Sequence, residues 1–161
     1  MFKLTFLMMD LNNDEQYKDF MLKYTKFSLE NYIKKILPGT KFEEEFDGNG
    51  RKYLKTDSMF LNQTSKLPTF YLTTSESKNM NLFFCFDSNH RGGPYAFMGK
   101  YHNIESGFER LQQELNTSIT CEEQINKITH ELQLEECIAE FRFETALLFG
   151  KFETTEGNWD Y

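Results

Sequence analysis

The feature that most constrains the fold is a pair of apolar segments separated by a short polar one. Residues 69–74 and 81–87 are rich in aromatic and β-branched residues, and the polar residues 75–79 between them are typical of a turn. We therefore predict a β-hairpin. In the second arm Leu82, Phe83, Phe84, Cys85 and Phe86 are apolar in succession. An uninterrupted apolar run has two buried faces, which predicts a central strand of a sheet that is covered on both sides.

Two further strands and a second hairpin are expected around this centre. Residues 40–46 and 51–55 flank Asp47-Gly48-Asn49-Gly50, whose residues suit the positive φ angles of a tight turn. Residues 95–101 read as a strand that follows a loop over residues 88–94. The apolar residues 1–9 read as an N-terminal strand, because they are too short and too interrupted for a signal peptide.

Helices are predicted before and after these strands in the sequence. A kinked or broken helix is expected over about 14–37, where apolar residues recur at three and four and Pro38-Gly39 ends the pattern. The same spacing predicts helices over about 104–115 and 121–133, the second beginning with a capping box at Thr120 and Glu123. Over residues 140–145 charged and aromatic residues alternate, which predicts a long strand. A helix over 134–148 is the alternative.

Length and element order together define the fold class. A chain of 161 residues suits a single domain spanning 1–161 and buries a core without disulfides or metals. The expected class is α+β, an antiparallel or mixed sheet with helices packed on it. We expect its core to unite the central hairpin with the later helices through Phe70, Leu72, Leu82, Phe84, Phe86, Phe108, Leu111, Ile125 and Ile128.

The cysteines and the hydropathy indicate which cellular compartment the protein occupies. Cys85, Cys121 and Cys137 are odd in number and far apart, which favours reduced thiols. There is no apolar run of about 20 residues to span a membrane. We therefore expect a cytoplasmic protein that neither crosses nor binds a membrane.

The charge is unevenly distributed along the chain. The net charge is −7, but residues 1–104 hold 14 Lys and Arg against 12 Asp and Glu, whereas residues 105–161 hold 4 against 13. The first part therefore carries +2 and the second −9. A region of −9 repels nucleic acid and attracts a basic protein.

Candidate partner-binding residues follow from this asymmetry. The only tryptophan, in the acidic and aromatic C-terminal tail, is of a type that interfaces favour. With the glutamates of the acidic segment it completes the candidate set: Glu131, Glu135, Glu136, Glu140, Glu144 and Trp159.

The sequence shows no catalytic signature with the required spacing. His130-Glu131 begins like a zinc-protease helix, but Leu134 stands where the second histidine ligand belongs. No metal, cofactor or catalytic residue is therefore expected, and the chain is predicted not to be an enzyme. The leading interpretation is a small acidic inhibitor of a basic protein, such as an immunity protein against a nuclease toxin or a phage-encoded inhibitor of a host nuclease.

An alternative interpretation makes the chain a hydrolase or a nucleotide-binding enzyme. Gly92 and Gly93 would expose backbone amides, Arg91 would bind an anion, and His90 with His102 would act as base and acid.

Overall fold

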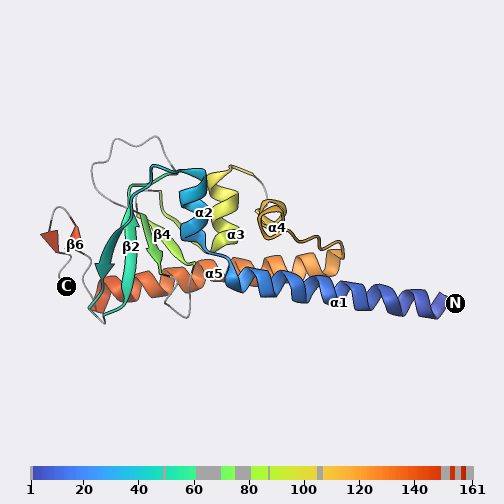
Figure 1. Cartoon of the computed structure of the whole chain (residues 1–161). Helices are drawn as coiled ribbons and strands as arrows, with labels where there is room; N and C mark the ends of the chain where they lie inside the picture. Colours follow the sequence, from blue (N-terminus) through green and yellow to red (C-terminus); the bar gives the residue numbers. More distant parts are fainter. Residues whose placement is uncertain are drawn as a thin grey trace.

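The computed structural model contains five helices around a five-stranded sheet (Figure 1). It describes residues 2–48, 50–60, 70–74, 81–86, 88–104, 107–149, 153–154 and 157–158, with side chains from residue 14 to residue 144 of these ranges. The helices are α1 (Phe2–Lys26), α2 (Leu29–Ile36), α3 (Pro94–Tyr101), α4 (Phe108–Leu115) and α5 (Glu122–Phe149). A two-stranded sheet, β6 (Glu153–Thr154) and β7 (Gly157–Asn158), follows them.

The main sheet is an antiparallel meander in chain order. Its strands are β1 (Glu43–Phe46), β2 (Lys52–Thr56), β3 (Phe70–Thr73), β4 (Phe83–Cys85) and β5 (His90–Gly92). Both predicted hairpins are confirmed, with Glu44 opposite Leu54 and Tyr71 opposite Phe84. The predicted turn at 75–79 lies outside the described residues.

The expectation that the second arm is a central strand is also confirmed. β4 lies between β3 and β5, and its three residues are all buried. Because side chains alternate along a strand, Phe83 and Cys85 enter one core while Phe84 enters another on the opposite face.

The two faces of the sheet are covered differently, and only α5 contributes to both of their cores. On one face Leu54, Phe70, Leu72 and Phe83 share a core with residues of α1 to α4 and the first half of α5. On the other face Tyr53, Tyr71 and Phe84 pack with Ala139 and Phe143 of α5. The core that we predicted as one is therefore divided by the sheet, with Leu82, Phe84 and Phe86 on the α5 side.

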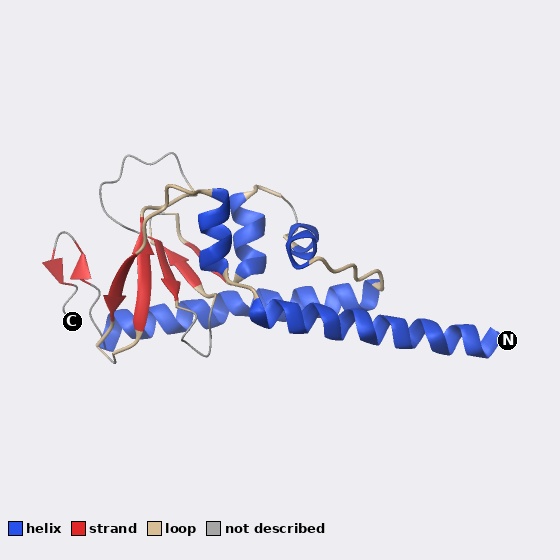
Figure 2. Cartoon of the chain, viewed as in Figure 1, coloured by secondary structure: helices blue, strands red, loops and turns tan. Residues whose placement is uncertain are grey.

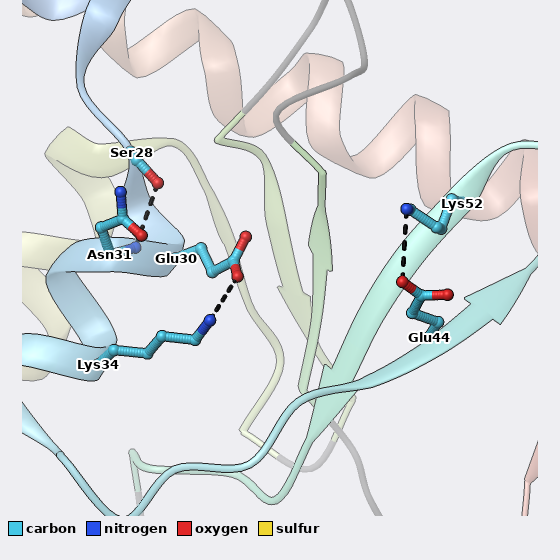
Figure 3. Close-up of polar contacts among 6 residues, drawn as sticks. All are labelled: Ser28, Glu30, Asn31, Lys34, Glu44 and Lys52. Carbon is cyan, nitrogen blue, oxygen red and sulfur yellow. Dashed lines mark hydrogen bonds and ion pairs between the residues drawn. The ribbon is translucent and has the colours of Figure 1, made fainter.

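The break predicted within residues 14–37 is confirmed between α1 and α2. Ser28 caps α2, since its hydroxyl accepts a hydrogen bond from the Asn31 amide at 3.1 Å (Figure 3). Glu30 and Lys34 pair one turn apart at 2.7 Å, and Figure 3 also shows Lys52 and Glu44 joining β2 to β1 at 3.4 Å.

Two predicted strands are helices instead. The strand expected at residues 1–9 is wrong, because these residues belong to α1, which projects beyond the remaining helices at its N-terminal end (Figure 2). Residues 95–101 form α3, in which Pro94 occupies the first turn, a position that does not need its missing amide hydrogen.

The strand predicted at residues 140–145 is also wrong, and the helical alternative for 134–148 is confirmed. One helix, α5, runs from Glu122 to Phe149 and includes the helix expected at 121–133. It passes beneath the sheet with its second half and lies beside α1 with its first (Figure 1). The predicted fold class, a single α+β domain with helices packed on an antiparallel sheet, is confirmed.

Candidate partner-binding surface

The inner side of α5 is defined by side chains that the rest of the chain buries. Ile128, Leu132, Ala139 and Phe143 are each at most 5% exposed. Their spacings of four, seven and four place them along one side of a helix. This side carries the hydrophobic contacts that join α5 to both cores.

Glu135, one of the predicted partner-binding glutamates, lies on this inner side. Its carboxylate accepts a hydrogen bond from the Tyr24 hydroxyl of α1 at 2.6 Å. It also lies so close to Gly93 that a Cβ there would clash with the carboxylate. Burial raises the pKa of Glu135 to about 7, despite the opposing effect of the Tyr24 hydrogen bond.

Glu140 is bound to Arg91, the residue that the alternative interpretation assigned to an anion. Arg91 Nη1 and Glu140 Oε1 are 2.8 Å apart, and the guanidinium also lies 4.6 Å from the centre of the Phe84 ring. The Asn89 side chain accepts a further hydrogen bond from Arg91. Arg91 therefore links β5 to α5, with 12% of its side chain exposed.

The other predicted glutamates, Glu131, Glu136 and Glu144, are exposed. Glu135 is engaged within the fold, whereas Glu140, although it is paired with Arg91, keeps 46% of its side chain exposed. Trp159 lies outside the described residues.

The outer side of α5 carries a feature that the sequence analysis missed. Leu134, Ile138 and Phe141, which we call the outer row, are 49%, 47% and 72% exposed. Their spacing of four and three gives one surface of a helix, and a helical reading of residues 134–148 would have shown it. Glu131 precedes Leu134 by three residues and Glu144 follows Phe141 by three, so acidic side chains bracket the row.

Between α5 and the sheet, a buried chain of polar contacts connects the first hairpin to the helix. Asp47 accepts hydrogen bonds from the Tyr53 hydroxyl and from the Arg51 amide, each at 3.0 Å. Arg142 Nε lies 3.2 Å from the same Tyr53 oxygen. Arg142, a member of the predicted alternating strand, is thus buried against β2 and fixes the position of α5 on the sheet.

The two histidines of the alternative interpretation lie at opposite ends of α3. His90 on β5 contacts the Phe60 ring at 5.0 Å between centroids, whereas His102, after α3, is 2.6 Å from the Tyr32 hydroxyl. Burial lowers the pKa of both histidines, with smaller lowering effects from Lys100 on His90 and Arg110 on His102. The structure does not bring the two rings together as a base and acid pair.

Neither a metal cluster nor a spanning helix emerges from the described part of the chain. Within it, no three His, Cys, Asp or Glu side chains gather as ligands, and no helix is both long and apolar enough to cross a bilayer. Comparison with known proteins gave no matching family, no curated relative and no similar solved structure.

Proposed function

We propose that this chain is a small acidic inhibitor that binds a basic protein partner through the outer side of α5. The observation that carries the proposal is the outer row, in which three large apolar side chains stand exposed between Glu131 and Glu144. Exposed apolar side chains on a helix suit insertion into a groove of another protein, and the flanking carboxylates suit a basic rim around that groove.

Charge decides between a basic partner and a second copy of the chain. Residues 105–161 carry a net charge of −9, so a second copy would bring like charges together across the interface. A basic protein is instead attracted before contact, which raises its association rate. An immunity protein that neutralises a nuclease toxin and a phage-encoded inhibitor of a host nuclease both fit this description.

The compartment proposed for this activity is the cytoplasm. Cys85, Cys121 and Cys137 are all free thiols, and Cys137 is exposed on α5 beside the outer row. Exposed thiols persist where the environment is reducing.

The proposal is tested by introducing a photo-crosslinking residue at Ile138, and in a control variant at the exposed Asn31 of α2, in the native host. We expect position 138 to form an adduct with one basic protein and position 31 to form none. Adducts of the same proteins from both positions, or an adduct with an acidic protein at position 138, would refute the proposal.

A second test separates the inhibitor from the hydrolase alternative. Replacing His90 and His102 with alanine together should leave binding to the cross-linked partner unchanged, because neither ring lies on α5. Loss of binding in a folded double variant would move the site to α3.

A further inference from the structure

One edge of the main sheet is left open by the described part of the chain. β1 is the outermost strand, next to β2, and among the described elements it packs chiefly against β2 (Figure 1). The opposite edge strand, β5, packs against both α3 and α5. An edge strand presents backbone N–H and C=O groups that can pair with another extended chain. The β1 edge is therefore the one that can accept a further strand.

The register identifies the backbone groups of β1 that point away from β2. The Asp47 amide donates a hydrogen bond to the Arg51 carbonyl at 3.0 Å, so these two residues form a hydrogen-bonded pair of the ladder. Such pairs alternate along antiparallel strands, so Glu45 turns its backbone groups toward β2, whereas Glu44 and Phe46 turn theirs outward. Among the described residues these outward groups have no hydrogen-bond partner. The amides and carbonyls of Glu44 and Phe46 are thus available to an incoming strand.

The side chains beside these groups are aromatic and acidic. Phe46 is 54% exposed, although it belongs to the sheet. Glu43 and Glu44 are exposed as well. The Glu44 carboxylate lies 3.4 Å from Lys52, whereas Glu43 has no ion pair within the described ranges. Because successive side chains point to opposite faces, an incoming strand would meet a carboxylate on each face of the sheet and the Phe46 ring on one.

Charge decides which extended chain suits this edge. Two copies joined through β1 would bring the glutamates of residues 43–45 against one another, and like charges on adjacent strands are destabilising. The C-terminal residues 150–161 hold one Lys against three Asp and Glu, so they are also repelled. A segment that carries lysine or arginine is attracted instead.

We propose that β1 accepts an extended basic segment of another protein as an additional strand of the sheet. Backbone hydrogen bonds to Glu44 and Phe46 hold the segment, its basic side chains pair with Glu43 and Glu44, and an apolar side chain covers the Phe46 ring. This surface does not include the outer row of α5, so the inference does not rest on the proposed function.

The proposal is tested with a synthetic peptide in which valine and lysine alternate, added to protein labelled with nitrogen-15. At a peptide concentration about ten times its dissociation constant, hydrogen exchange of the Glu44 and Phe46 amides should slow about tenfold, because both become bonded. The Glu45 amide, which already faces β2, should change little. A peptide with glutamate in place of lysine should protect none of these amides. Unchanged exchange at Glu44 and Phe46, or equal protection by the glutamate peptide, would overturn the proposal.

Two substitutions at one position separate strand addition from attraction between charges. Glu44→Pro removes the charge and the outward amide hydrogen, which β2 does not use, and proline is tolerated where an edge amide faces solvent. Glu44→Gln removes the charge alone. We expect Glu44→Pro to weaken peptide binding by about tenfold or more and Glu44→Gln by only about two- to threefold. Equal losses would show that the peptide does not extend the sheet and would overturn the proposal.

A last comparison locates the peptide and excludes self-association. The double variant Leu134→Ala and Ile138→Ala should bind the peptide as the wild type does, because it alters only the outer row. Loss of peptide binding in this variant would place the peptide on α5 and refute strand addition at β1. Slower exchange at Glu44 and Phe46 when protein concentration rises without peptide would identify a second copy as the occupant, which would also refute it.

Discussion

The two sides of α5 differ most clearly at Phe141 and Phe143. Phe143 is fully buried, with its ring 5.3 Å from that of Tyr53 and 5.7 Å from that of Phe84. Phe141, two residues earlier, is 72% exposed. The inner side therefore holds the helix on the sheet. The outer side presents apolar surface that stays largely exposed in the folded chain. Under the proposed function, the inner side of α5 serves stability and the outer side serves recognition.

The largest expected effect comes from truncating the two phenylalanines in turn. Phe143→Ala should reduce the free energy of unfolding by about 3 to 5 kcal/mol, because it leaves a cavity between α5 and the sheet. Phe141→Ala should cost less than about 1 kcal/mol, since most of its ring is already in water. Urea unfolding followed by circular dichroism measures both. Equal losses would show that α5 has no distinct inner side.

A backbone substitution under the inner side should have the next largest effect. Gly92 has a φ angle of +143°, and a Cβ there would lie 2.6 Å from that of Ala96. We expect Gly92→Ala to destabilise the fold by about 1 to 3 kcal/mol. Gly39→Ala is the control, because no atom lies within 4 Å of its Cβ position, and it should be neutral or stabilising by up to about 1 kcal/mol. A neutral Gly92→Ala would mean that β5 is not tightly packed against α3 and α5.

The buried polar chain should contribute less than the rings. Tyr53→Phe removes the hydroxyl that joins Asp47 to Arg142, and we expect a loss of about 1 to 2 kcal/mol in thermal unfolding. Tyr95→Phe is the matched control, because among the described residues the half-buried Tyr95 hydroxyl has no hydrogen bond partner. An unchanged melting temperature for Tyr53→Phe would show that apolar contacts alone hold α5 on the sheet.

The outer row should contribute least to stability and most to binding. Leu134→Ala and Ile138→Ala each remove a side chain that is about half exposed, so each should cost about 1 kcal/mol or less. The yield of the adduct formed with the basic partner, with the photo-crosslinking residue moved to position 141, should nevertheless fall sharply in the double variant. An undiminished yield would leave the outer row without a role in recognition.

Local signals in the sequence predicted most of the sheet. The Asp47-Gly48-Asn49-Gly50 turn correctly predicted that β1 and β2 flank it. The apolar run at Phe83 to Cys85 correctly predicted a buried strand, β4. The break between the first two helices was also predicted, because the apolar spacing is interrupted near Ser28, the residue that caps α2 in the structure.

The errors arose where two periods fit the same residues. Charge and ring alternate from Glu140 to Glu144, as on a strand, but in α5 Arg142 and Phe143 are buried while Phe141 and Glu144 are exposed. An arginine buried beside Tyr53 follows from tertiary contacts that no local pattern contains. The inward position of Glu135 likewise depends on Tyr24, 111 residues away in the chain.

The most direct test of the account is the salt dependence of association with the basic partner identified by cross-linking. Replacing Glu131 and Glu144, the exposed residues that bracket the outer row, with glutamine should slow association at low salt and flatten its decline as salt is added. Stability should change by no more than about 1 kcal/mol, because exposed charges contribute little to folding. Association at the wild-type rate, with the wild-type salt dependence, would contradict the proposal that the acidic outer side of α5 recognises a basic partner.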